Sequence, residues 1–137
     1  MTNRNRTRPH TSYIKKLFVI TTVLSSLSGG ANAAPPLQPQ TETEVTYLLE
    51  FVQASACQFN RNDTWYNGKD ARLHLEMKYD SLVSKGSITK AEDFIDKAAS
   101  KSSLSGRNYQ IRCQDGKTIS SAPWFTDELK RYRKDKK

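Results

Sequence analysis

A histidine and a lysine four residues apart are the side chains of this sequence best placed to bind a ligand. His74 and Lys78 share one face of a helix, because residues four apart are neighbours on a helix surface. Arg61 and Asn62 precede that segment, and a serine-rich stretch, Ser100–Ser105, follows the next one. Two cations, an imidazole and several hydroxyl groups suit an anionic or sugar-like ligand.

These polar groups come together if the helix that carries His74 pairs with the next helix as an antiparallel hairpin. The serine-rich turn then lies near the start of the first of the two helices, beside Arg61. The candidate ligand-binding residues are Arg61, Asn62, His74, Lys78, Ser100, Ser102, Ser103 and Tyr109. A structural role is the alternative: His74 and Arg61 bind loop carbonyl groups, and the serines cap helix ends.

Catalytic motifs in the sequence are incomplete, so no catalytic residue is assigned. Residues 87–90 match the S-x-x-K pattern of penicillin-binding enzymes, but the partner motifs are absent. No G-x-S-x-G or H-E-x-x-H is present, and we expect no metal and no cofactor. A small envelope hydrolase that pairs His74 with a serine of the Ser100–Ser105 turn is the enzymatic alternative to a non-catalytic module.

The first 33 residues have the three parts of a cleavable secretion signal. Residues 1–16 carry basic and no acidic side chains, residues 17–27 are an apolar run, and Ala31-Asn32-Ala33 is an A-x-A cleavage site. The apolar run is much shorter than the roughly 20 residues that cross a bilayer. We therefore expect a signal peptide at residues 1–33, export to the periplasm, and no membrane segment after cleavage.

The basic character of the chain is confined to its two ends. The whole sequence has a net charge of +8, but the signal and the final stretch, KRYRKDKK, hold the excess of basic side chains. The part between them is slightly acidic. Because nucleic-acid binding needs basic groups spread along a face, we exclude a nucleic-acid partner. The basic tail either contacts an anionic envelope surface or is a solvated, frayed end.

Cys57 and Cys113 are the two cysteines of the sequence. An even number of cysteines in an exported protein predicts a disulfide, and we expect these two to be bonded. Two buried free thiols are the alternative, since spacing alone does not show whether the two side chains are close in space.

The hydrophobic pattern predicts an α+β fold with three helices, a β-hairpin and a short C-terminal helix. Residues 34–41 are rich in proline and are expected to form an extended leader. The first helix is expected over about residues 42–56, with Thr41 and Glu44 as a capping box. Residues 58–68 are rich in turn formers, so we expect a loop there.

The next two helices have their own start signals. The second is expected to begin at Asn67 or Asp70, and the third at a capping box of Thr89 and Glu92. The inner face of the third helix is expected to consist of Ala91, Phe94, Ile95, Ala98 and Ala99.

A hairpin and a last helix complete the predicted domain. The hairpin turns at Asp115-Gly116, with Ile119 directed inward, and the last helix begins near Pro123. One α+β domain, residues 42–133, is therefore expected, followed by a basic tail at residues 134–137.

Four short motifs follow one another along the chain. They are Phe59-x-Arg61-Asn62, Ala71-x-x-His74-Leu75-x-x-Lys78, Glu92-x-Phe94-Ile95 and Ala99-Ser100-x-Ser102-Ser103-x-Ser105-Gly106-x-x-Tyr109. This order resembles the YfeK-like family, small exported proteins of Gram-negative bacteria whose function is unknown. The resemblance covers about residues 45–133 and implies a periplasmic location, but no activity. Asp63 departs from the family pattern, in which glycine is expected after Arg-Asn.

These features predict a small periplasmic protein that acts as a non-catalytic binding or interaction module. Its partner is expected to be an envelope protein or a small anionic or sugar ligand. The small envelope hydrolase is the second interpretation.

Overall fold

The structure, a computed structural model, describes residues 36–137 and shows helices and short strands in that range. In chain order the elements are α1 (Pro39–Ala54), β1 (Gln58–Arg61), β2 (Thr64–Tyr66), α2 (Gly68–Ser84), α3 (Ala91–Phe94), the π-helical turn η1 (Ile95–Ala99), β3 (Gln110–Arg112), β4 (Thr118–Ser120) and α4 (Ser121–Asp135). The predicted α+β class is confirmed. The predicted signal peptide, residues 1–33, lies outside the described residues. No helix of the described range combines the length and the apolar character that a bilayer crossing requires.

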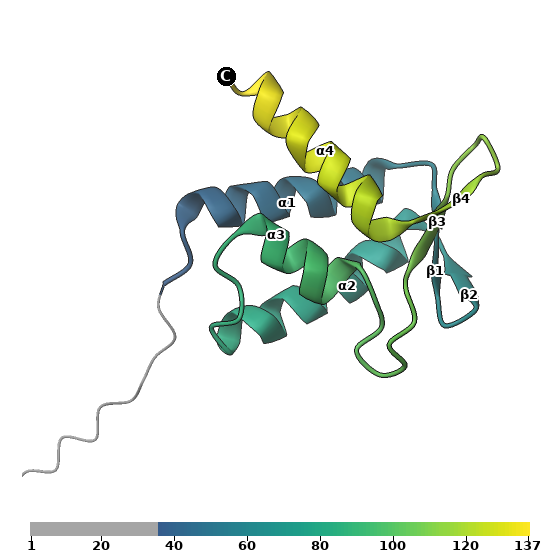
Figure 1. Ribbon diagram of the computed structural model, residues 1–137, viewed down its shortest axis with the longest axis horizontal. Helices are drawn as coiled ribbons and strands as arrows, with labels where there is room; N and C mark the ends of the chain where they lie inside the picture. The colour runs from purple at the N-terminus through teal and green to yellow at the C-terminus, as the bar shows by residue number, and fades with distance from the viewer. Residues whose placement is uncertain (1–35) are drawn as a thin grey trace, which may run out of the picture. The chain divides into compact units, whose positions relative to one another are not determined.

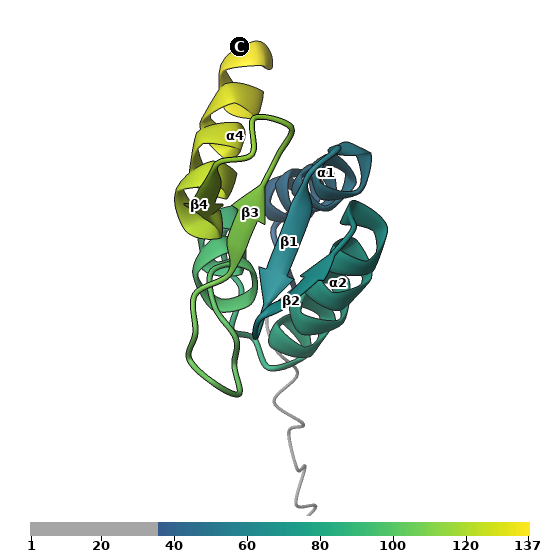
Figure 2. The same ribbon diagram turned by 90° about the vertical axis from the view of Figure 1, so that its right-hand side faces the viewer.

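The strands form one antiparallel sheet in the order β2-β1-β3-β4, and the helices lie on one side of it (Figure 1, Figure 2). Phe59 of β1 pairs with Tyr66 of β2 and with Ile111 of β3, and Ile111 pairs with Ile119 of β4. Residues paired across antiparallel strands share a face, so these side chains form a row on the helix side of the sheet. Ile119 ends the row on an edge strand, and it remains 44% exposed although it has the predicted direction.

The β1–β2 hairpin replaces the loop that was predicted at residues 58–68. The two strands are joined by the turn Asn62-Asp63, in which φ is 51° and 67°. Positive φ at both central residues is the type I′ geometry of short hairpins, and Asn and Asp tolerate it better than most residues. This conformation explains how an aspartate can occupy position 63, where the family resemblance led us to expect glycine.

The first helix, α1, begins at Pro39, so the last residues of the predicted extended leader are helical. Proline suits the start of a helix, because the N–H that it lacks would have no partner there. The predicted capping box is wrong: Thr41 Oγ1 donates to the carbonyl of Thr89 at 2.9 Å, and Glu44 binds Arg133 of α4. Both side chains are buried, and partners from other elements have replaced the local ones.

The caps of the next two helices are predicted in part. Asn67 caps α2, because its side-chain oxygen accepts a hydrogen bond from the N–H of Asp70 at 2.9 Å. The carboxylate at the start of α3 is that of Asp93 and not the predicted Glu92. It accepts hydrogen bonds from the N–H and the hydroxyl of Thr89, at 2.8 and 2.7 Å. Glu92 points to α4 instead, where it finds a cation.

Apolar side chains between the helices and the sheet form the core. The predicted inner face of the third helix is confirmed, since each of its members is buried: Ala91, Phe94, Ile95, Ala98 and Ala99. The second half of this helical segment, η1, is wound as a π-helix. Phe125 and Leu129 bring α4 to the same core, as its amphipathic pattern predicts.

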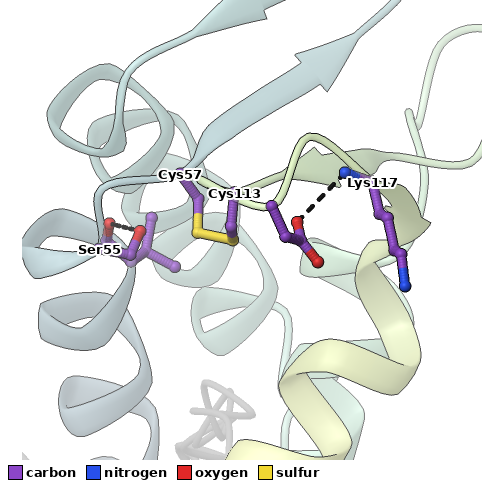
Figure 3. Close-up of a disulfide and its surroundings, with 6 residues drawn as sticks. Ser55, Cys57, Cys113 and Lys117 are labelled. Atoms are coloured by element: carbon purple, nitrogen blue, oxygen red, sulfur yellow. Dashed lines mark hydrogen bonds between the residues drawn. A yellow bond between two sulfur atoms is a disulfide. The ribbon is translucent and has the colours of Figure 1, made fainter.

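The predicted disulfide between Cys57 and Cys113 is present (Figure 3). Cys57 directly precedes β1, and Cys113 directly follows β3. Their neighbours Gln58 and Arg112 are paired across the two strands, so the disulfide continues this pairing by one step. It therefore ties the sheet to the C-terminal end of α1.

The last helix, α4, runs to Asp135, so it includes most of the final basic stretch, residues 130–137. Arg133 donates hydrogen bonds to Glu44 of α1 at 2.7 Å and to Glu92 of α3 at 2.6 Å. The side chain of Glu44 is only 5% exposed, and that of Arg133 is 37% exposed. Arg133 thus holds α4 against α1 and α3.

Gly68→Ala tests the close approach of α2 to α1. A Cβ atom on Gly68 would lie 2.3 Å from the carbonyl oxygen of Val52, near the end of α1. Because that atom belongs to the backbone, we expect the substitution to lower the free energy of unfolding by about 2–3 kcal/mol. Lys69→Ala, at the exposed neighbouring position, should change it by less than about 0.5 kcal/mol. Urea titration measures both, and equal stabilities would contradict the contact.

Arg133→Met tests the ion pair between α4 and α1. The guanidinium holds the pKa of Glu44 below its ordinary value of 4.5. The ion pair therefore stabilises the folded protein fully above pH 4.5, and this stabilisation is lost as the pH falls through the lowered pKa of Glu44. We expect the variant to lose about 1–3 kcal/mol at pH 7, a range that allows for the partial exposure of Arg133.

The pH profile gives this test a second readout. Between pH 7 and pH 3, stability should fall less steeply in Arg133→Met than in the unchanged protein. Lys134→Met, an exposed cation on the same helix, should leave both stability and profile unchanged. Unfolding curves recorded across this range measure the effect, and a parallel decline in all three proteins would refute it.

Candidate functional site

A cavity of about 150 Å³ lies between the inner face of the sheet and the helices. Residues of β1, β2, α2, η1 and α4, together with Tyr109 before β3, line it: Phe59, Asn60, Arg61, Tyr66, Asp70, Ala71, His74, Leu75, Ala99, Tyr109, Ser121 and Phe125. Three of the candidate ligand-binding residues, Arg61, His74 and Tyr109, are in this lining. We call these three the polar cluster.

Arg61 is the last residue of β1 and points to the same side of the sheet as Phe59, two residues earlier. Its guanidinium donates a hydrogen bond to the hydroxyl of Tyr66 at 3.2 Å, and its Cζ atom lies 4.8 Å from the centre of that ring. Within residues 36–137, no carboxylate is at ion-pair distance from this arginine. The cavity wall therefore holds a cation that has no acidic partner in the described chain.

His74 and Lys78, one turn apart on α2, both contact the hydroxyl of Tyr109. The hydroxyl oxygen lies 3.2 Å from His74 Nε2 and 3.5 Å from Lys78 Nζ. Lys78 also donates a hydrogen bond to the carbonyl of Lys101 at 2.8 Å. The lysine thus joins α2 to the turn before β3, and it reaches the cavity only through Tyr109.

Burial and the neighbouring positive charges keep His74 neutral well below pH 7. Burial, and then the positive charges of Arg61 and Lys78, lower the pKa of His74 to about 4. Burial and Arg61 lower the pKa of Lys78 to about 8. Burial also raises the pKa of Tyr109. At neutral pH the site therefore presents a permanent cation, an uncharged imidazole and an uncharged phenol.

Asn62 braces the serine-rich turn against the β1–β2 hairpin. It accepts a hydrogen bond from the hydroxyl of Ser105 at 2.6 Å and donates one to the hydroxyl of Ser102 at 3.4 Å. The Ser102 side chain is buried, and its oxygen also accepts hydrogen bonds from N–H groups of its own turn. These contacts join the turn to the hairpin, and they are not the helix caps that the alternative interpretation of the serines expected.

The other predicted serines also lie outside the cavity lining. The hydroxyl of Ser100 donates to the carbonyl of Asp96, and Ser103 is exposed. The structure thus brings part of the candidate set to the cavity. The residues that do not line it are Asn62, Lys78, Ser100, Ser102 and Ser103.

The hydrogen-bond partner of His74 is a phenol and not a serine. In the part of the chain that the structure describes, no serine hydroxyl is bonded to this imidazole. A histidine with a pKa of about 4 is also a poor base at neutral pH. The geometry therefore gives no support to a hydrolase built on His74 and Ser100–Ser105. The described residues also contain no cluster of three or more His, Cys, Asp or Glu side chains that could hold a metal ion.

The apolar wall of the cavity was missed by sequence reasoning. Phe59, Leu75 and Phe125 come from a strand and two helices and meet only in the folded chain. Leu75 and Phe125 could have been identified from the sequence, because each lies at an apolar position with helical spacing. Phe59 was expected to fold back onto the core from a loop, and it packs on the core from a strand. Ser121 adds a buried hydroxyl that is already bonded within the fold.

Arg61→Gln tests the cause of the lowered pKa of His74. We expect this pKa to rise from about 4 in the variant but to stay below its ordinary value of 6.5, because burial is the larger cause. Arg112→Gln removes a cation from the opposite face of the sheet, where it stacks on Trp65, and should leave the pKa unchanged. NMR titration of the imidazole measures the shift, with His74→Gln to assign the signal.

The lowered pKa of His74 also makes the folded protein less stable at acidic pH. The unfolded chain, in which histidine titrates near 6.5, takes up a proton that the folded chain binds only near pH 4. Stability must therefore fall as the pH falls through this window. The fall should be smaller in His74→Gln, and an identical profile would contradict the burial of a neutral histidine.

Comparison with known proteins gives a family but no activity. The model of a family of unknown function, DUF5329, matches residues 39–133, which include every described strand and nearly all of the described helices. No curated protein and no solved structure matches the chain. The YfeK-like name and the export that it implies remain predictions. Because the match extends over most of its length, the chain belongs to the DUF5329 family of unknown function.

Proposed function

We propose that this protein is a periplasmic binding module without catalytic activity of its own, and that the cavity is its ligand site. The observation that carries the proposal is an apolar wall combined with the polar cluster of Arg61, His74 and Tyr109 in one cavity. Ligand sites in proteins are typically concave and mainly apolar, with a few polar groups that fix the orientation of the ligand.

The cavity is a region where the side chains of the core are not fully packed against one another. Protein interiors are close-packed, and a void costs free energy because the atoms around it lose contacts. Two of the lining residues, Ala71 and Ala99, are alanines on helical segments, where larger apolar side chains would fill the space. A cavity with an apolar wall, beside a cation that has no carboxylate at ion-pair distance among the described residues, is better explained by a ligand than by the demands of the fold.

The groups in the polar cluster suit binding better than catalysis. Arg61 is a permanent cation, and His74 is neutral and held by the phenol of Tyr109. None of these groups is poised to exchange a proton near pH 7, which general acid–base catalysis requires. Each can still donate or accept a hydrogen bond to a bound molecule.

The disulfide supports the periplasmic part of the proposal. Disulfides persist in oxidising compartments and are rare in the bacterial cytosol. The bond between Cys57 and Cys113 joins two segments that the fold brings together, so it is compatible with an exported protein. The signal pattern of residues 1–33 points in the same direction.

Ala71→Leu tests the cavity as a ligand site. The larger side chain should fill the apolar part of the cavity and exclude a ligand. The purified proteins are incubated with a periplasmic extract, washed and denatured, and the small molecules released are identified by mass spectrometry. We expect one compound to be enriched at least about tenfold on the unchanged protein relative to Ala71→Leu.

Ala54→Leu is the matched control, because it makes the same change at an exposed position at the end of α1. It should retain the compound. Equal recovery from all proteins, or from none, would overturn the proposal that the cavity is a ligand site.

A further inference from the structure

We infer that the ligand of the cavity is a small organic carboxylate whose apolar part is about the size of one benzene ring. The inference rests on the proposed function, since it assigns a chemical class to the ligand of the same cavity. It depends on three observations: the size of the cavity, the apolar character of its wall, and the unpaired charge of Arg61.

The volume limits the apolar part of the ligand. The cavity measures about 150 Å³. An engineered apolar cavity of about this size is known to bind benzene. Phe59, Leu75 and Phe125 offer ring and aliphatic surfaces to a ligand of that size. An aromatic ring or a short branched chain fits this space, whereas a long acyl chain or a sugar ring with its hydroxyl groups does not.

The guanidinium of Arg61, which has no carboxylate at ion-pair distance among the described residues, favours an anion on the ligand. Arg61 donates to the phenol of Tyr66 and, within the described residues, makes no other side-chain hydrogen bond. Most of its five N–H donors are therefore free. Its charge also lowers the pKa of both His74 and Lys78, so it acts on them through a poorly screened region. A bound anion would neutralise this charge.

A carboxylate suits this site better than a phosphate. The guanidinium fork matches the two oxygens of a carboxylate in a planar, bidentate arrangement. Lys78 is already bound to the carbonyl of Lys101, so a single fixed cation faces the ligand. Asp70 also lines the cavity, where its carboxylate accepts a hydrogen bond from Asn67. This nearby negative charge disfavours a second charge on the ligand.

The test compares four probes of matched shape by isothermal titration calorimetry. Phenylacetate has the ring and the charge, phenylacetamide has the ring without the charge, and acetate has the charge without the ring. Phenethylamine carries the opposite charge. We expect phenylacetate to bind at least about tenfold more tightly than each of the others, the size expected for a hydrogen bond to a charged group.

Two arginine variants test whether Arg61 is the cation that binds the carboxylate. Arg61→Gln should lose at least about tenfold in affinity for phenylacetate and lose clearly less for phenylacetamide, which has no charge to pair, and a urea titration shows that the variant is folded. Arg112→Gln, on the opposite face of the sheet, should bind both probes like the unchanged protein. A saturating concentration of phenylacetate should raise the pKa of His74 in NMR titration, and phenylacetamide should not.

Failure of this inference differs from failure of the proposed function. If phenylacetamide binds as tightly as phenylacetate, or if Arg61→Gln binds phenylacetate like Arg112→Gln, the carboxylate assignment is wrong, although the cavity still binds. If Ala71→Leu binds phenylacetate normally, the carboxylate does not occupy this cavity and the inference is overturned. Absence of any probe binding overturns it as well, while the extract experiment decides independently whether the cavity holds another ligand.

Discussion

The close approach of α2 to α1 at Gly68 is the constraint on which the rest of the fold depends. The chain leaves α1 at Ala54, forms the β1–β2 hairpin and returns at Gly68, whose missing side chain leaves room for the carbonyl of Val52. The base of the hairpin is therefore closed. Its strands are too short to be stable alone, so they depend on this closure and on the disulfide at Cys57. The sheet is held against the helices from the end where the hairpin begins.

Closure at the base determines where the far end of the hairpin lies. Arg61 is the fourth and last residue of β1, and it lies on the same face of the sheet as the buried Phe59. A residue of that length and charge at this position reaches the space between the sheet and α2. A cation at this position has an electrostatic cost. Its positive charge, together with the burial of His74, lowers the pKa of that histidine. No carboxylate of the described residues lies at ion-pair distance from Arg61, so the offset of this cost must come from solvent or from a bound molecule.

The helices could be predicted from the sequence, but most of the cavity could not. The apolar spacing of the third helix is a local signal, and each of its inner positions is buried. The capping boxes failed because Thr41, Glu44 and Glu92 have stronger partners on distant segments, which local patterns do not contain. The hairpin at residues 58–68 was missed because Asn62-Asp63 forms a type I′ turn without glycine. Arg61 was expected near the start of the helix that carries His74, but without that strand its place on the inner face of a sheet could not be derived.

The serine-rich turn shows why residue types alone misassigned part of the site. Its hydroxyl groups are bonded to Asn62 and to the turn itself, which joins the tip of the hairpin to the segment before β3. Tyr109 lies at the end of that segment, and its N–H is bonded to the carbonyl of Ser100. The brace therefore holds the phenol that binds His74. The serines of this turn therefore do not line the cavity. They hold the turn that positions Tyr109, and the side chains that line the cavity are the ones that can contact a ligand.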